Sequence, residues 1–130
     1  MHPAITTSTL LRTIYALCLL GAASTHVWTV ATHGLFYDYG GVSTFTQIYW
    51  TSLTALDPLA AVLLFVKPRA GVVLTMTIIV SDVVHNTWLM SRNANANWSN
   101  WMYVLQVIFL IFVLLTISRA WQVASTGRPA

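Results

Sequence analysis

The stretch IIVSDVVHNTWLM, residues 78–90, sets an aspartate, a histidine and an asparagine into an otherwise apolar sequence. With 3.6 residues per helical turn, Asp82, His85 and Asn86 share one side of a helix. A carboxyl group paired with an imidazole can donate and accept protons near neutral pH. The pattern therefore predicts either acid–base chemistry at these residues or a network of hydrogen bonds between helices.

Polar side chains reach the same depth from three other apolar stretches. Counted at about 1.5 Å per residue along antiparallel helices, Asp57 is level with Asp82, and His26 and Gln106 lie within roughly one turn of it. The polar residues of each stretch run from its outer end to mid-depth, which predicts a pocket open outward and closed toward the cytoplasm. The candidate catalytic residues are Asp82, His85 and Asp57. The candidate ligand-binding residues are His26, Asn86, Gln106, Trp50, Thr54, Trp88 and Tyr103.

The two intramembrane aspartates are costly unless they face one another or other polar groups. An aspartate at the bilayer centre costs at least about 2.5–3.5 kcal/mol on insertion scales. We expect Asp57 and Asp82 to face the bundle, where they pair with imidazole or amide groups or are protonated. If the two are close, at most one is ionised. A purely structural network would gain only about 0.6 kcal/mol per bond, which favours a function for Asp82 and His85.

Four apolar stretches of about 20 residues must position these side chains: residues 10–32, 45–66, 70–90 and 101–120. Each is long enough to cross a hydrocarbon core of about 30 Å as a helix. Only 7% of the 130 residues are charged, against roughly a quarter in soluble domains. Short connections make consecutive helices antiparallel neighbours. We predict one integral membrane domain over residues 1–130, an all-α up-down-up-down bundle of four transmembrane helices.

Basic residues indicate how this bundle is oriented. A cytoplasmic N-terminus leaves Arg92 outside and puts the other Lys and Arg residues inside: Arg12, Lys67, Arg69, Arg119 and Arg128. The positive-inside rule therefore predicts that both termini are cytoplasmic, and we expect a bacterial inner (plasma) membrane. A signal peptide cleaved near Ala23 is the alternative for the first stretch. The apolar run continues beyond that point through VWTVA, which favours an uncleaved helix.

The sequence lacks the residues that several classes of function require. The basic residues are scattered, so no nucleic-acid partner is expected. Cys18 is the only cysteine, and the sequence contains no HExxH motif and no phosphate-binding glycine loop, so we expect no metal site and name no cofactor. Hydrolysis and phosphoryl transfer are poorly supported for the same reason.

Aromatic side chains gather in the outer half of the predicted bundle, where they could enclose rings or an isoprenoid tail. Together with the polar stripe, they predict a site that binds a small apolar or lipid-like molecule. Whether the site also transforms that molecule by acid–base chemistry is left open. The expected partners are membrane lipid and a small hydrophobic ligand, with a homodimer or a larger membrane complex as alternatives.

His26, Pro58, the basic turn KPR and His85 resemble, in their order along the chain, the four-helix core of the emopamil-binding, sigma-2-receptor-like family. The resemblance covers nearly the whole chain but consists of single residues. It implies four helices and a sterol-like ligand held by an acidic residue near the outer end of the second span. That region here reads YWTSLTALDP, whose only acid, Asp57, lies deeper, so we do not transfer the ligand to this chain.

Three other functions compete with ligand binding. His26 and His85 could be the two axial ligands of a haem in a four-helix bundle, although Asp82 is an awkward neighbour for an apolar macrocycle. A proton-coupled transporter would have about this length, and small four-span exporters are similar to the chain in size only. An accessory subunit of a larger membrane complex would use the polar stripe as its contact surface.

Overall fold

A computed structural model describes residues 6–126 of the chain, and the side chains of residues 6–122. Four helices make up this part: α1 (Thr7–His33), α2 (Thr44–Val66), α3 (Pro68–Ser91) and α4 (Trp101–Thr126). Each is long and apolar enough to cross a membrane. The predicted all-α bundle of four membrane-spanning helices is therefore confirmed.

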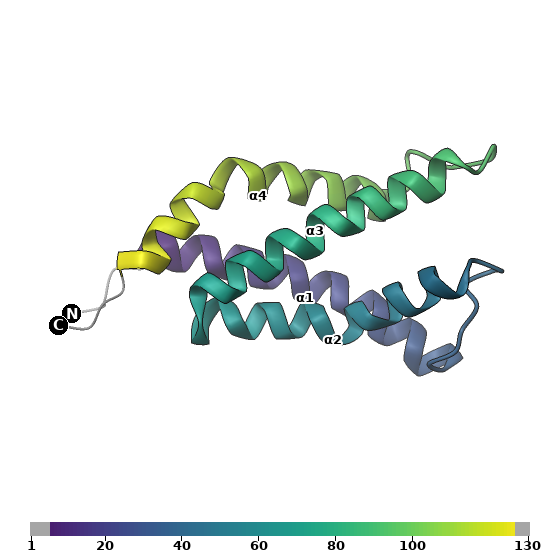
Figure 1. Ribbon diagram of the computed structural model, residues 1–130, viewed down its shortest axis with the longest axis horizontal. Coiled ribbons are helices and arrows are strands. Elements are labelled where there is room, and N and C mark those ends of the chain that lie inside the picture. The colour runs from purple at the N-terminus through teal and green to yellow at the C-terminus, as the bar shows by residue number, and fades with distance from the viewer. Residues whose placement is uncertain (1–5, 127–130) are drawn as a thin grey trace.

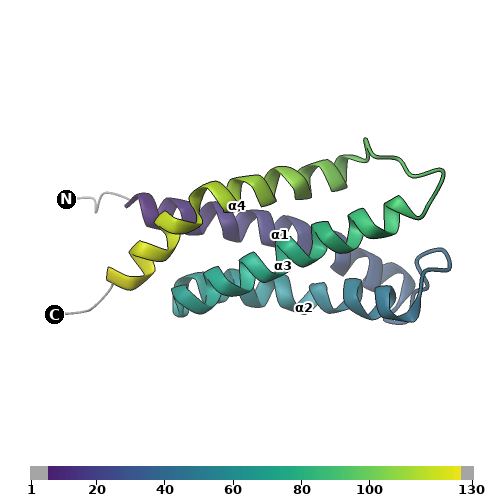
Figure 2. The same cartoon turned by 45° about the horizontal axis from the view of Figure 1, so that its top comes forward.

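The helices run up, down, up and down, each packed against the next, and α4 packs back against α1 (Figure 1). The start of α1, the α2–α3 turn and the end of α4 lie at one end of the bundle, which we call the terminal end. The two long connections, residues 34–43 and 92–100, lie at the opposite loop end (Figure 2). The pair α1 and α2 diverges from the pair α3 and α4 toward the loop end (Figure 1).

Local sequence signals set the helix boundaries. The side chains of Thr6 and Ser43 each accept a hydrogen bond from the backbone N–H three residues later, which caps α1 and α2. Gly34 ends α1 with a φ of 86°, a conformation that favours glycine. Pro68 opens α3 in the first turn, where its missing N–H costs no helical hydrogen bond.

The helices close tightly in the half of the bundle nearest the terminal end. Tyr15 of α1 is fully buried, and its hydroxyl lies 2.6 Å from the Thr116 hydroxyl of α4. Its ring packs edge-on against Phe109 and Phe112, with centroids 6.0 and 5.8 Å away. Because these contacts join α1 to α4, they close the bundle below any space at the loop end.

A glycine permits the closest approach between two helices. A Cβ atom at Gly71 of α3 would collide with the backbone of Leu64 in α2. The single residue Lys67 connects the two helices. The short turn and the missing side chain together hold α2 and α3 in contact from the terminal end upward.

Candidate functional site

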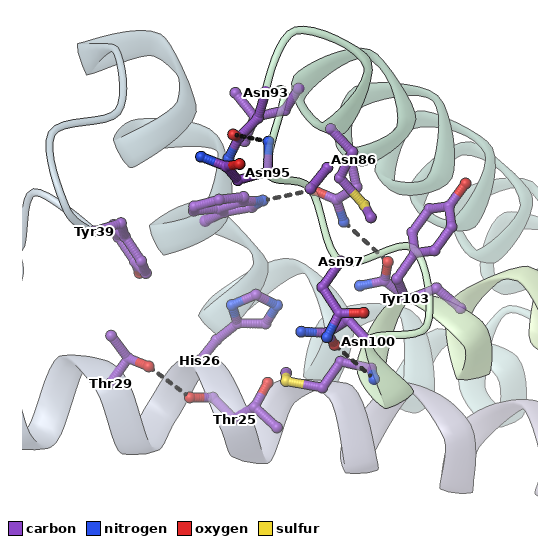
Figure 3. A pocket seen from close by; sticks show the side chains of 16 residues that line it. Thr25, His26, Thr29, Tyr39, Asn86, Asn93, Asn95, Asn97, Asn100 and Tyr103 are labelled. Carbon is purple, nitrogen blue, oxygen red and sulfur yellow. Dashed lines mark hydrogen bonds between the residues drawn. The ribbon is translucent and has the colours of Figure 1, made fainter.

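A pocket of about 450 Å³ lies at the loop end of the bundle. It is lined by α1, α3, α4 and the 92–100 connection, with one residue from the 34–43 connection and one from α2 (Figure 3). The contacts of Tyr15 with α4 close the bundle beneath it. Five of the residues proposed from the sequence line this pocket: His26, Trp50, Asn86, Tyr103 and Gln106.

A chain of hydrogen bonds joins three helices at the wall of the pocket. The indole Nε1 of Trp50 donates to Asn86 Oδ1 at 3.1 Å. Asn86 Nδ2 donates to Asp82 Oδ1 at 3.1 Å and to Gln106 Oε1 at 2.9 Å. An indole N–H can only donate, and a carboxylate can only accept, so these two partners fix the orientation of the Asn86 amide.

Asp82 supports the pocket without lining it. Only 5% of this residue is exposed, and its carboxyl accepts from the Asn86 amide one helical turn closer to the loop end. The amide partner is one of those expected for an intramembrane aspartate. Asn86 therefore separates the Asp82 carboxyl from anything bound in the pocket.

His26 is the titratable imidazole that faces the pocket. Its ring projects from α1 into the space between Tyr39 and Asn100 (Figure 3). Within residues 6–122, the imidazole forms no hydrogen bond with another side chain or with the backbone. Its ring nitrogens are therefore available to a bound molecule.

His85 lies in a different environment, away from the pocket lining. Four aromatic rings surround its imidazole, with centroid distances of 4.9 to 6.3 Å: Tyr49, Phe45, Trp88 and Trp50. Its Nε2 is buried and has no hydrogen-bond partner in the part of the chain that the structure describes. The expected pairing with Asp82 does not occur in the described part of the chain, because the Asp82 carboxyl turns toward Asn86 at i+4 rather than toward His85 at i+3.

Asp57 and Thr54 lie in the core of the bundle and not in the pocket lining. Asp57 is 1% exposed, and among residues 6–122 neither its Oδ1 nor the Thr54 hydroxyl has a hydrogen-bond partner. Pro58 has no N–H to donate to the Thr54 carbonyl one turn earlier. The Asp57 carboxyl is close enough to Asp82 to interact electrostatically. Within the described residues, this part of α2 thus holds two buried oxygens without a partner, Asp57 Oδ1 and the Thr54 hydroxyl.

Trp88 also stands apart from the pocket. It is 46% exposed, and the guanidinium of Arg92 lies over its ring at 4.8 Å from the centroid. A cation over an indole ring near a helix end is typical of the membrane interface. Trp88 therefore lies at the loop-end surface beside His85.

Helical periodicity could not reveal the part of the lining that comes from the connections. Tyr39 lines the pocket from the first connection, with a φ of 50° and a buried hydroxyl that has no partner. The second connection adds four asparagines: Asn93, Asn95, Asn97 and Asn100. The concentration of asparagine in SRNANANWSN was the available signal, because an amide-rich loop next to a polar stripe can cover it.

Comparison with family models, with curated proteins and with solved structures finds no match. The resemblance to the emopamil-binding family is therefore limited to single residues. Two of these residues, His26 and His85, lie in separate environments. What this chain does must be inferred from its own site.

Proposed function

We propose that this protein binds a small apolar or lipid-like molecule in the pocket at its loop end. The observation that carries the proposal is the 450 Å³ pocket itself, which lies within the range of small-molecule sites. Its lining combines the rings of Tyr39, Trp50 and Tyr103 with the polar groups of His26 and Gln106. Aromatic walls with a few polar groups suit a molecule that has an apolar body and a polar head.

The closed terminal half of the bundle supports binding over transport. A transport pathway needs access from both sides of the membrane. Below the pocket, Tyr15 fills the space between α1 and α4, and Leu64, Val72 and Val113 are fully buried. The alternative of a proton-coupled transporter therefore requires a rearrangement of this packed half.

The positions of the two intramembrane histidines do not favour haem. A bis-histidine haem needs both imidazoles to face one cavity. His26 lines the pocket, whereas His85 is enclosed by aromatic rings outside the lining. The two rings therefore do not present a pair of axial ligands.

Acid–base chemistry on a bound molecule, if it occurs, falls to His26. This imidazole faces the pocket, while Asp82 lies behind Asn86 and His85 lies outside the lining. His85 and Asp57 have no direct access to the pocket in this arrangement. We therefore propose His26, and not the Asp82–His85 pair, as the residue that would exchange a proton with the bound molecule. Asp82 is a positioning residue that holds the Asn86 amide in place.

We place the loop end outside, in a bacterial inner membrane, because the basic residues gather at the terminal end. Of these, Arg12, Lys67, Arg69 and Arg119 lie in the described part of the chain, and Arg92 is the exception at the loop end. Reaction of the Cys18→Ser/Asn95→Cys variant with a membrane-impermeant maleimide added to intact cells tests this orientation, with Cys18→Ser alone as the control. Labelling that occurs only after cell lysis would show that the loop end faces the cytoplasm.

Native mass spectrometry of the purified protein tests the binding proposal. Thr29 lines the pocket, whereas Thr32, one turn along the same helix, is exposed and lies outside it. We expect a lipid-like molecule to be bound to the unaltered protein and to the control variant Thr32→Phe. We expect it to be absent from Thr29→Phe, because the added ring fills the pocket. The absence of any bound molecule from all three proteins, together with recovery in a larger complex, would favour the accessory subunit instead.

A further inference from the structure

We infer that the pocket selects an uncharged molecule whose polar head is a hydrogen-bond acceptor of the carbonyl type. This inference rests on the proposed function and narrows its ligand class. It follows from which atoms of the lining are already used in hydrogen bonds. It concerns the wall formed by α4 and the 92–100 connection, which we call the donor wall and which contains Gln106, Asn97 and Asn100.

Gln106 belongs to the donor wall because its oxygen is occupied. Trp50 and Asp82 fix the Asn86 amide so that its nitrogen faces Gln106. Gln106 Oε1 accepts from that nitrogen at 2.9 Å. The Gln106 amide nitrogen forms no hydrogen bond with the part of the chain that the structure describes, so both of its N–H groups remain to be satisfied.

The two asparagines of the donor wall are arranged in the same way. Asn97 Oδ1 accepts from the Ser99 backbone N–H at 3.1 Å, and Asn100 Oδ1 accepts from the Met102 N–H at 3.0 Å. Each bond closes a local turn, and the second caps the start of α4. The side-chain nitrogens of Asn97 and Asn100 lie on the side of these residues that faces His26 (Figure 3).

The opposite wall, on α1, offers one side-chain N–H donor, the imidazole of His26, because its two threonine hydroxyls are used within the helix. The hydroxyl of Thr25 donates to the Ala22 carbonyl at 2.8 Å, and that of Thr29 donates to the Thr25 carbonyl at 3.0 Å. Their hydrogens are therefore used within the helix. The donor wall thus presents three amide nitrogens to the pocket, and Asn93 and Asn95 of the same connection add two more. Only an acceptor on the ligand can satisfy these N–H groups.

The charge of the lining indicates that this acceptor is neutral. Among the described residues, no lysine or arginine lines the pocket. Asp82 lies directly behind Asn86, so a carboxylate or phosphate head would approach an acidic group without a cation to balance it. A ketone, ester or quinone-type carbonyl satisfies the N–H groups without that cost, and its apolar body fits the aromatic side of the pocket.

Three probes of matched chain length test this ligand class: an alkyl phenyl ketone, the corresponding alkylbenzene and the corresponding fatty carboxylate. Each is titrated into the full chain in lipid nanodiscs, with empty nanodiscs correcting for partition into lipid. We expect the ketone to bind about tenfold more tightly than the alkylbenzene, as about two hydrogen bonds to neutral groups would give. We also expect its carbonyl infrared band to move to lower wavenumber on binding.

Substitutions of the donor wall separate this effect from a loss of folding. The double variant Asn97→Asp/Asn100→Asp keeps both turns, because a carboxylate accepts the same backbone N–H groups, but it removes two amide donors. The single variant Gln106→Leu removes the third amide donor of the wall. We expect both variants to reduce the preference for the ketone several-fold. Ser91→Asp, which adds a charge at the loop end outside the pocket, should leave the preference unchanged.

The outcomes distinguish this inference from the proposed function. Equal affinity for the ketone and the alkylbenzene would contradict the inference that the donor wall binds a carbonyl group. It would not contradict the proposal that the pocket binds a ligand. Tighter binding of the carboxylate would overturn the assignment of a neutral head. No saturable binding of any probe would overturn both the inference and the proposed function.

Discussion

At the scale of single residues, the two intramembrane histidines have different surroundings although their sequence contexts look alike. His26 projects into a pocket, and His85 packs among aromatic rings. Both are partly buried, and neither has an acidic partner within the described residues. The difference lies in which helix face each one occupies, and for this reason we propose ligand contact for His26 and not for His85.

Replacing each histidine by phenylalanine tests this assignment. We expect His26→Phe to lower the occupancy of the pocket at least several-fold, because it removes the ring nitrogens and adds an apolar ring to the lining. His85→Phe should leave occupancy unchanged, because phenylalanine can pack in the same aromatic cluster. Native mass spectrometry of the two variants measures this. Loss of the bound molecule from His85→Phe alone would mean that His85, and not His26, contacts the molecule.

Asp57 carries a carboxyl group that is buried in the bundle. A buried polar atom without a partner costs about 1–3 kcal/mol, and Asp57 Oδ1 has no partner among the described residues. We expect Asp57→Asn to raise the midpoint of thermal unfolding in detergent, because the amide carries no charge and therefore costs less to bury than a carboxylate. A lower midpoint would mean that the carboxyl group has a partner, such as a cation, that the amide cannot replace.

At the scale of the helices, the pocket exists because the bundle is tight at one end and spread at the other. Gly71 brings α3 against α2, and Tyr15 brings α1 against α4, both in the terminal half. At the loop end, the long 92–100 connection spans the space above the polar stripe. The helix contacts near the termini therefore position a site that lies farther along the same helices.

Two glycine substitutions test the close packing of the helices near the terminal end. We expect Gly71→Ala to reduce the free energy of unfolding by about 1–3 kcal/mol, because the new methyl group meets the Leu64 backbone and the helices must shift. Gly21→Ala is the matched control, since nothing lies within 4 Å of the added Cβ atom and alanine favours a helix. Equal stability of the two variants, measured by thermal or denaturant unfolding in detergent, would contradict the close contact of α2 and α3.

At the scale of the whole molecule, the architecture could be predicted from the sequence more fully than the site. Length and hydropathy define four spans, because a helix must be about 20 apolar residues long to cross the bilayer. Periodicity also brought Asn86, Gln106 and His26 to one level, and the structure places all three in the pocket lining.

The remaining features depend on side-chain rotamers and loop conformation, which periodicity does not determine. Asp82 and His85 share a helical side, yet a bond to Asn86 turns the Asp82 carboxyl away from His85. Tyr39 and the asparagines of the second connection reach the pocket through turns that have no repeating pattern. The donor wall could not be predicted either, because it depends on which amide oxygens are already hydrogen-bonded.

The central claim is that a lipid-like molecule occupies the pocket at the loop end. An experimental structure of the protein purified from its membrane and kept in lipid nanodiscs tests this claim most directly. We predict non-protein density in the pocket, in contact with His26 and with its polar end against Gln106 and Asn97. An empty pocket with α1 and α4 closed together at the loop end would contradict the claim.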